Sequence, residues 1–344
     1  MKRILAIGTG GTIASQLAPD GLQPELNTDQ LLSQVPAIRE FCDVVCNQLC
    51  SIDSTNMSPS RWVQMARAIR DDYDNYDGFV IIHGTDTMAY TAAALSYLIQ
   101  GSPKPIVLTG AQKPIGSDST DSKMNLEDAF RCACSNLCGV LLVFNGKVML
   151  GTRARKTHTK SFRAFSSINY PELAYIRDGR VLPFIVPESR ERPIFYDRMD
   201  EKVALLKMIP GTDSALLAWM LEHNDALIIE SFGVGGMPSY RGTEFHDLMA
   251  AAMKQGKTIV MTTQVENEGS DLAVYSVGNS LKTQLGVLEA YDMTTEAVVG
   301  KLMWILGQTR DPDEIRRLFY RPVAADILIP TSEARTRSSA GRRS

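Results

Sequence analysis

The stretch ILAIGTGGT at residues 4–12 places four apolar residues directly before a glycine-rich loop that ends in Thr12. The stretch FVIIHGTDT at 79–87 repeats this arrangement and leads into a loop that contains Thr85 and Asp86. Short apolar runs followed by glycine are typical of buried parallel strands, and open α/β sheets hold ligands at the carboxyl ends of such strands. The two stretches therefore predict a parallel sheet in which two hydroxyl groups and one carboxylate meet in one crevice.

The glycine-rich loop does not match the two common nucleotide-binding loops. A dinucleotide fingerprint would need a third glycine where the chain has Ile13, and an acidic residue about 20 residues further on at the end of a second strand. A P-loop would end in Gly-Lys-Ser or Gly-Lys-Thr, which is not present here. A purely structural tight turn remains an alternative interpretation of the loop.

Helix and strand signals alternate along the first half of the chain. Capping residues precede apolar helical patterns that begin near residues 28, 59 and 87. Further buried strands are predicted at 105–109 and 140–144. The alternation predicts an α/β fold of two doubly wound domains, the larger amino-terminal one with a flavodoxin-like or Rossmann-like parallel sheet.

A polar stretch rich in helix and strand breakers follows residue 183. We therefore expect an amino-terminal catalytic α/β domain at 1–185, a linker region at 186–215 and a smaller carboxy-terminal α/β domain at 216–331. The remaining residues, 332–344, are rich in serine and arginine, and this composition predicts a disordered tail.

Composition and charge exclude several classes of protein. The chain has 344 residues, of which 44% are hydrophobic and 22% are charged, which is enough for two domains with separate cores. The net charge of −3 and the pI near 5.9 predict no nucleic-acid partner. No apolar run approaches the roughly 18 residues of a membrane span, so we expect no membrane association. The first strand begins without a separate signal sequence, which favours a cytoplasmic location.

The six cysteines fall into two groups of three, at Cys42, Cys46 and Cys50 and at Cys132, Cys134 and Cys138. We interpret them as small buried hydrophobic residues in a reducing compartment. The first group would share one face of either a helix or a strand, which makes a metal site conceivable. No histidine lies near it in the sequence, so we expect neither a metal nor a cofactor.

Five short motifs stand in order along the chain: TGGTIA at 9–14, HGTDTM at 83–88, TGAQKP at 109–114, RARKTH at 153–158 and DMT at 292–294. Together they resemble the bacterial-type L-asparaginases, the asparaginase and glutaminase family that uses a threonine nucleophile. The resemblance covers nearly the whole chain and implies a cytoplasmic, type I enzyme. Such an enzyme hydrolyses L-asparagine to L-aspartate and ammonia. The preference between L-asparagine and L-glutamine stays open, because they differ by one methylene group, which changes binding by only about 1–3 kcal/mol in a pocket.

The resemblance also implies catalytic roles for four residues. Thr12 would attack the side-chain amide carbon and form a β-aspartyl ester, while Thr85, Asp86 and Lys156 would move protons and position the water. Activation is needed because a threonine hydroxyl at its ordinary pKa is a poor nucleophile. A lysine in a dry pocket can supply it by acting as a base.

The same resemblance implies how the substrate is held. Asp86 would bind the α-ammonium group, and Ser54 with Thr55 would bind the α-carboxylate, since both charges must be paired when they leave water. Thr85 would also contact the substrate, and the carbonyl of Ala111 would contact the amide nitrogen. His83 and His158 receive no catalytic role, since His83 reads as a core histidine.

Two positions fit the family pattern poorly. Leu22 stands where many members carry a tyrosine on the loop after the nucleophile, which leaves the activation of Thr12 open. Glu266 matches only loosely the glutamate that secreted members supply from a neighbouring subunit. The resemblance implies a homodimer or homotetramer with shared active sites.

Two other functions remain as alternatives. An amidotransferase-type subunit that releases ammonia for tRNA-linked amidation shares these motifs, but the acidic pI disfavours tRNA. A non-catalytic amino-acid-binding protein would keep Ser54 and Asp86 and would lose Thr12 or Lys156, yet both are present. The sequence therefore favours the hydrolase.

Overall fold

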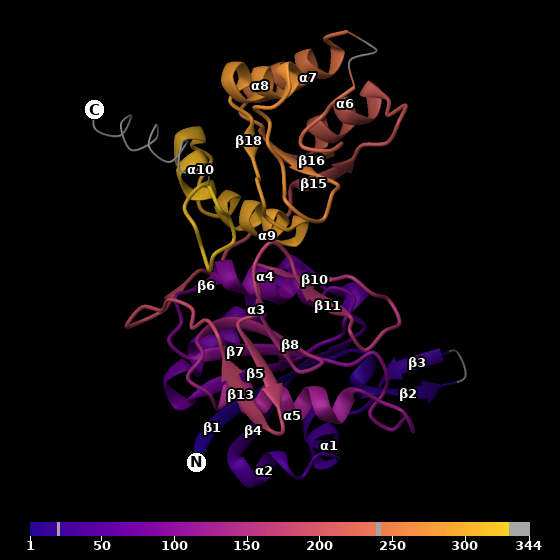
Figure 1. Cartoon of the computed structure of the whole chain (residues 1–344), viewed down its shortest axis with the longest axis vertical. Coiled ribbons are helices and arrows are strands. Elements are labelled where there is room, and N and C mark those ends of the chain that lie inside the picture. The colour runs from indigo at the N-terminus through magenta and orange to yellow at the C-terminus, as the bar shows by residue number, and fades with distance from the viewer. Residues whose placement is uncertain (19–20, 239–241, 330–344) are drawn as a thin grey trace. The chain divides into compact units, whose positions relative to one another are not determined.

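The computed structural model describes the backbone of residues 1–18, 21–238 and 242–329, and their side chains except at 16–18, 21–24 and 276–277. The chain forms two compact units, Met1–Glu201 and Lys202–Ser344 (Figure 1). The expected tail at 332–344 lies outside the described residues.

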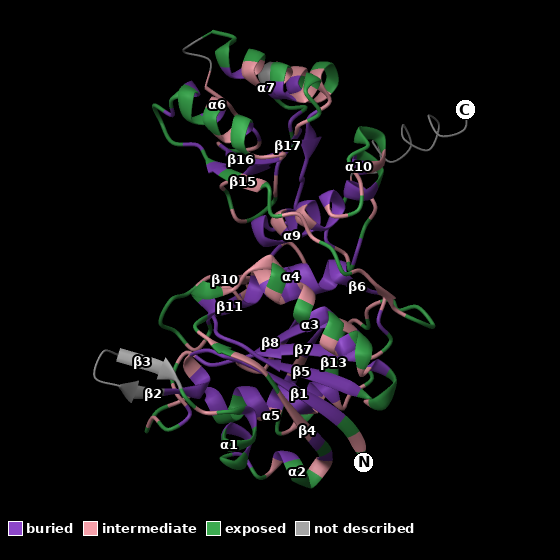
Figure 2. Cartoon of the chain, turned by 180° about the vertical axis from the view of Figure 1, so that it is seen from behind, coloured by how far each residue is buried: buried purple, intermediate pink, exposed green. Residues whose placement is uncertain are grey.

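Unit 1, Met1–Glu201, is built on an eight-stranded sheet with the order β13-β12-β9-β8-β7-β5-β1-β4. The strands are β1 (Lys2–Gly10), β4 (Cys42–Ile52), β5 (Gly78–Ile82), β7 (Pro105–Thr109), β8 (Gly139–Phe144), β9 (Lys147–Leu150), β12 (Ala174–Arg177) and β13 (Arg180–Pro183). The five strands from β4 to β8 are parallel. Every residue of β5 and β7 is buried, as Figure 2 shows for the middle of the sheet, because helices cover both faces of a parallel sheet.

The other three strands run antiparallel at one edge, which the sequence analysis did not predict. Two tight hairpins produce this edge. Asn145 and Gly146 join β8 to β9 with φ of 50° and 73°, and Asp178 and Gly179 join β12 to β13 with φ of 49° and 69°. Asn-Gly and Asp-Gly pairs adopt such left-handed conformations easily, so both turns were present in the sequence as signals. The sheet is therefore mixed, with a parallel core.

The helices of unit 1 are α1 (Thr28–Ser33), α2 (Ile38–Phe41), α3 (Pro59–Asp71), α4 (Met88–Leu98) and α5 (Ser122–Ala133). The expected starts of α1, α3 and α4 are confirmed, and Asn27 caps α1 through a capping box with Gln30. Figure 1 shows α3 and α4 on one side of the sheet and α1 and α5 on the other. The short strands are β2 (Ser15–Ala18), β3 (Gly21–Pro24), β6 (Ile99–Gln100), β10 (Ala154–Lys156), β11 (Phe165–Ser167) and β14 (Ile194–Phe195).

Unit 2 contains a four-stranded parallel sheet with the order β15-β16-β17-β18. Its strands are β15 (Val203–Lys207), β16 (Ala226–Ser231), β17 (Thr258–Thr263) and β18 (Leu288–Glu289). Its helices are α6 (Ser214–His223), α7 (Glu244–Lys254), α8 (Ser276–Ser280), α9 (Thr295–Leu306) and α10 (Pro312–Phe319). The predicted smaller α/β domain is confirmed.

The boundary between the units differs from the expected one. Unit 2 begins at Lys202, inside the stretch 186–215 that we expected to be a linker. β15 pairs with β16 along its length, and α6 begins at Ser214, so the second half of that stretch belongs to unit 2. β15 is a short edge strand with only one buried residue, although its sequence, VALLK, begins with four apolar residues.

The segment 42–52 forms a strand, which decides the open choice between helix and strand. Cys42 is buried in it, and Cys46 and Cys50 are half-buried. Within the described ranges no group of three or more histidine, cysteine, aspartate and glutamate side chains is placed to hold a metal. The helices of the same ranges include none that is both long and apolar enough to span a bilayer.

The carboxyl group of Asp128 on α5 predicts a pH-dependent stability. Asp128 is 9% exposed. Burial raises the pKa of its carboxyl group from 3.8 to about 7; the charge of Glu127 adds a smaller increase, and that of Arg131 opposes it. The folded state therefore favours the protonated form, and stability is lost as the pH rises from about 4 through 7. At pH 8 we expect Asp128→Asn to increase the free energy of unfolding by up to about a few kcal/mol and so to raise Tm. At pH 4 the same substitution should change Tm little.

Thermal unfolding of the two proteins across this pH range measures the effect. Glu40→Gln, at an exposed position on α2, is the matched control and should leave the pH dependence of Tm unchanged. An equal shift in Tm at both pH values would contradict this assignment.

Candidate active site

Three loops meet at the carboxyl ends of neighbouring strands in unit 1. β1 pairs in parallel with β5, with Gly8 opposite Ile82, so the loops that follow these two strands leave the sheet side by side. β4 pairs with β1 on its other side and leads into a 3-10 turn, Ser54–Asn56. The two apolar runs form parallel strands of one sheet, as predicted, and a third loop lies beside the two that follow them.

Two glycines allow these loops to touch. Gly11 has φ of 84°, and its N–H donates to the carbonyl of Ile52 at 3.0 Å. A Cβ atom on Gly11 would overlap the backbone of Gly84, and one on Gly84 would lie 2.7 Å from Cβ of Ser54. Any larger residue at either position would push the loops apart. The backbone neighbours of Gly11 and Gly84 are Thr12 and Thr85, so the same contact brings the backbones of both threonines close together.

Lys156 connects two of the sequence-predicted residues directly. Its Nζ atom donates to Oγ1 of Thr85 at 2.8 Å and to Oδ1 of Asp86 at 2.6 Å. The lysine lies at the end of β10, which β11 holds in an antiparallel pair. Its side chain is 16% exposed, whereas that of Asp86 is 57% exposed. The cluster therefore has a covered cation and a carboxylate that solvent or a ligand can reach.

Gln112 extends this cluster and was missed by the sequence analysis. The Thr85 hydroxyl accepts a hydrogen bond from the Lys156 ammonium group, and it donates its own proton to Oε1 of Gln112 at 3.2 Å. Nε2 of Gln112 donates to the carbonyl of Ser161 at 3.1 Å, and the Asp121 carboxylate accepts from its backbone N–H. Gln112 lies within the third motif, directly after Ala111, and that position was the available signal.

Thr12 is the first residue of a 3-10 turn, Thr12–Ala14, and it is half-buried. In the part of the chain that the structure describes, no hydrogen-bond partner occupies its hydroxyl group. This leaves the oxygen free to meet a ligand at the point where Gly11 contacts Gly84. The fully buried Ala111 follows β7 at the same edge of the sheet.

The loop that carries Ser54 and Thr55 is held by its own side chains. Asp53 caps the turn by accepting from the N–H and the hydroxyl of Thr55, both at 2.8 Å. The Thr87 hydroxyl donates to the carbonyl of Ser54 at 2.7 Å, which ties this loop to the one that carries Thr85. Ser54 is buried and Thr55 is exposed.

His83 is a buried core histidine in the structure. Burial lowers its pKa to about 4, although a hydrogen bond with Gly84 opposes the shift. Its Nδ1 atom lies 2.7 Å from the Gly84 carbonyl, and its Nε2 atom lies 3.0 Å from the Thr91 hydroxyl. A carbonyl can only accept, so Nδ1 carries the proton and Nε2 accepts. The neutral ring therefore supports the loop backbone, and no catalytic role was expected for it.

The described contacts test neither of the two residues that match the family pattern poorly. Leu22 lies in β3 and pairs with Leu17 of β2, but its side chain lies outside the described side chains. Glu266 follows β17 and belongs to unit 2. Their roles stay predictions.

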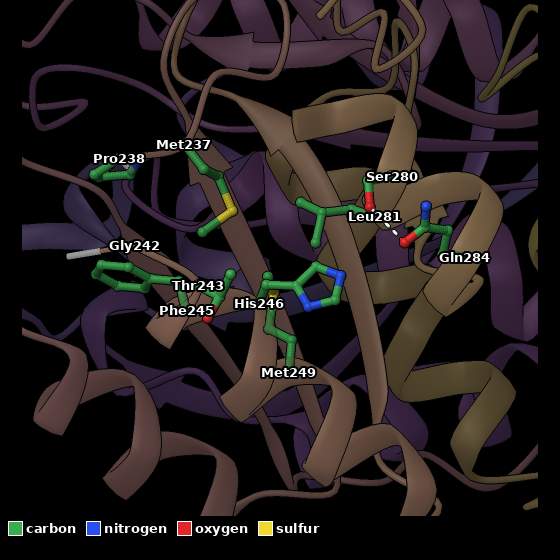
Figure 3. Close-up of a pocket in the computed structure, with 10 residues that line it drawn as sticks. All are labelled: Met237, Pro238, Gly242, Thr243, Phe245, His246, Met249, Ser280, Leu281 and Gln284. Atoms are coloured by element: carbon green, nitrogen blue, oxygen red, sulfur yellow. Dashed lines mark hydrogen bonds between the residues drawn. The ribbon is translucent and has the colours of Figure 1, made fainter. Parts of the chain in front are cut away.

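A separate cavity of about 390 Å³ lies in unit 2 (Figure 3). Its described lining residues are Met237, Pro238, Gly242, Thr243, Phe245, His246, Met249, Ser280, Leu281 and Gln284. Figure 3 shows the hydrogen bond between Ser280 and Gln284, and among these lining residues there is neither a carboxylate nor a lysine. The cavity therefore lacks the combination of groups found in unit 1.

The fold and these contacts define the class of the molecule: a two-unit α/β protein that holds a threonine hydroxyl, a lysine and an aspartate together at the ligand-binding edge of its larger sheet. Comparison with known families agrees. Residues 3–184 match the amino-terminal domain of asparaginases, and residues 202–319 match the carboxy-terminal domain of glutaminases and asparaginases. The chain belongs to the asparaginase family and is an amidohydrolase.

Individual relatives extend this finding. The L-asparaginase of Thermococcus kodakarensis is 39% identical, over 94% of this chain and 99% of the relative. A solved structure of the thermostable L-asparaginase from the same organism matches with a TM-score of 0.90 and 38% identity, over 95% of this chain and 100% of the other. A glutamyl-tRNA(Gln) amidotransferase subunit from Pyrococcus abyssi is 34% identical, over 95% of this chain and 77% of the relative.

The contact between Gln112 and Thr85 gives a testable expectation for amide hydrolysis. Gln112→Met removes the acceptor of the Thr85 proton and the tether to Ser161, so Thr85 loses its fixed orientation. One such hydrogen bond contributes about 0.5–1.5 kcal/mol, so kcat should fall up to about 10-fold. Initial rates at saturating substrate measure the change, with Gln64→Met on the exposed face of α3 as the control. An unchanged kcat would show that Gln112 does not orient Thr85.

Proposed function

We propose that this protein hydrolyses L-asparagine to L-aspartate and ammonia through a β-aspartyl ester on Thr12. The observation that carries the proposal is the position of Lys156, which contacts the Thr85 hydroxyl and the Asp86 carboxylate at the same time. The contact of Gly11 with Gly84 supports it, because Thr12 and Thr85 directly follow these two glycines in the chain. The similarity to the L-asparaginase of Thermococcus kodakarensis supports the substrate.

The proposed reaction has two halves. In the first, Thr12 attacks the side-chain amide carbon, the C–N bond breaks, and the nitrogen leaves as ammonia. In the second, a water molecule attacks the ester, and aspartate is released. Thr85 and Lys156 form a hydrogen-bonded pair that would carry the proton away from the attacking oxygen.

Substrate recognition would use both charged ends of the amino acid. In the described part of the chain only Oδ1 of Asp86 has a partner, Lys156, so Oδ2 is available for the α-ammonium group. Ser54 and Thr55 would bind the α-carboxylate, and the carbonyl of Ala111 would accept from the amide nitrogen. The rigid capping of the Ser54 loop supports this role, because donors held in place cost little ordering on binding.

Ammonia release by the purified chain tests the proposal. We expect ammonia and aspartate in equal amounts from L-asparagine, with no other protein and no RNA present. L-Glutamine in a parallel assay would measure the side-chain preference. Asparagine binding without any ammonia release would instead favour a binding protein. Ammonia release that requires a second protein and tRNA would favour an amidotransferase component, the function named for the relative in Pyrococcus abyssi.

We also propose that the protein assembles into a homodimer or homotetramer. Exposed apolar side chains in unit 2 support this, among them Leu216 and Trp219 on α6 and Val265 after β17. Stable assemblies bury apolar surface of this kind. Size-exclusion chromatography with light scattering measures the state, and a fully active monomer would contradict the proposal. A cytoplasmic location is proposed as well, and the six free thiols support a reducing compartment.

A further inference from the structure

Two cysteines outside the active site, Cys42 and Cys134, form a contacting pair. Cys42 is the first residue of β4, and Cys134 directly follows the end of α5. The Cys42 thiol donates to the carbonyl of Ile38 at 3.4 Å, and its sulfur interacts with the side chain of Cys134. Neither cysteine is in a disulfide. They are 92 positions apart in the sequence, and the fold brings them together.

Contacts on either side hold the pair in register. The guanidinium group of Arg131 lies 4.4 Å from the ring centre of Phe41, the residue before Cys42. Lys2 lies opposite Cys42 in the pairing of β1 with β4, and its Nζ atom donates to the carbonyl of Ser135 at 2.9 Å. Figures 1 and 2 both show α2 and the start of β4 beside α5. The backbones that carry the two thiols are therefore fixed next to each other.

The two thiols differ in access and in acidity. Cys42 is only 1% exposed, whereas Cys134 is half-buried. The interaction with Cys42 lowers the pKa of Cys134, and Lys2 and Arg131 add to this against the effects of burial and Asp77. Burial raises the pKa of the thiols in Cys46, Cys50, Cys132 and Cys138. Cys134 is thus the thiol of this chain best suited to react as a thiolate.

We propose that Cys42 and Cys134 form a reversible disulfide when the protein meets hydrogen peroxide. The Cys134 thiolate attacks one peroxide oxygen and the O–O bond breaks. The other oxygen takes up one proton and departs as water, and Cys134 becomes a sulfenic acid. The Cys42 sulfur then attacks this sulfur, the S–S bond forms, and the sulfenic oxygen leaves as a second water. The two thiols lose two electrons and two protons, and the peroxide becomes two waters. A dithiol reductant reverses the reaction.

The disulfide would act on stability and leave the chemistry of the proposed site alone. It joins the start of β4 to the end of α5, whereas the active-site loops leave the opposite, carboxyl end of the β4 and β1 strands. Closing a loop of about 90 residues removes conformations from the unfolded chain. We therefore expect the oxidised protein to have a Tm several degrees higher and an unchanged rate of amide hydrolysis.

Peptide mapping under non-reducing conditions tests this directly. The full-length protein is treated with hydrogen peroxide, its remaining thiols are alkylated, and a proteolytic digest is analysed by mass spectrometry. We expect one cross-linked peptide pair containing residues 42 and 134, which dithiothreitol separates. Cys134→Ser and Cys42→Ala should each abolish it, and Cys46→Ser, the matched control on the same strand, should leave it intact.

A second measurement covers variants that fold poorly. In the unmodified protein, Cys134 should be alkylated faster than the other five cysteines at neutral pH, because it is the most thiolate-like of them. Equal alkylation rates, oxidation of Cys134 to a sulfinic acid without cross-linking, or a disulfide between other cysteines would overturn the proposal. Absence of amide hydrolysis would contradict the proposed function but would not affect the disulfide proposal, because peptide mapping does not depend on activity.

Discussion

Thr12→Ala should lower kcat for asparagine hydrolysis by at least about 10³-fold while the protein stays folded, because the variant lacks the oxygen that forms the covalent intermediate. The Thr12 hydroxyl has no hydrogen-bond partner in the described structure. Its removal therefore breaks no internal hydrogen bond, and misfolding would not explain a loss of activity. Initial rates measured with thermal unfolding separate the two effects.

Thr12→Ser provides the matched control, because it keeps a hydroxyl at the same place and should retain measurable turnover. Thr85→Ala should also lose orders of magnitude, since it removes the group that Lys156 and Gln112 hold between them. The double variant should be little worse than either single one, because groups that act in one cycle are not additive. If Thr12→Ala turned over asparagine at a rate near that of the wild type, Thr12 would not be the nucleophile.

Asp86→Ala should lower kcat/KM for asparagine by about 10²–10³-fold, because the α-ammonium group would lose its counter-charge. The effect should depend on the substrate. Succinamic acid, which has the same amide and carboxylate but no ammonium group, should be a poor substrate of the wild type and should lose much less on the substitution. Steady-state kinetics with both substrates measure this difference.

Asp74→Ala, an exposed aspartate in the turn after α3, controls for a general loss of negative charge and should change neither substrate. Asp86 also contacts Lys156, so part of the loss could come from a displaced lysine. That part would affect both substrates equally. An equal loss for asparagine and succinamic acid would therefore assign Asp86 to positioning Lys156 instead of binding the ammonium group.

The core of the fold could be predicted because its signals are local. Each central strand contains a short apolar run bounded by turn residues. Each of the three predicted helices in unit 1 follows a residue type that is common at N-caps, and Asn27 caps α1 with its side chain. The antiparallel edge was missed although the Asn145-Gly146 and Asp178-Gly179 pairs that create it are local signals too. β15 was missed although its sequence, VALLK, begins with four apolar residues, because it lies in the stretch after residue 183 that polar and breaker residues marked as a linker.

The active site could be predicted only in part. The glycine loops indicated a crevice with two threonines and an aspartate, but Lys156 is 71 positions from Thr85, and no spacing in the sequence predicts their contact. The family resemblance alone suggested it. Gln112 and the Cys42–Cys134 pair were missed because their significance depends on which distant side chain each one touches, and that is a property of the folded chain.

Trapping the covalent intermediate tests the central claim most directly. The protein is mixed with excess L-asparagine, quenched in acid within the first turnovers, digested and analysed by mass spectrometry. Our account predicts a peptide spanning Thr12 that is heavier by one aspartyl group, absent from Thr12→Ala and enriched in variants that slow the second half of the reaction. An aspartyl group on any other residue, or steady turnover by Thr12→Ala with no labelled peptide, would contradict it.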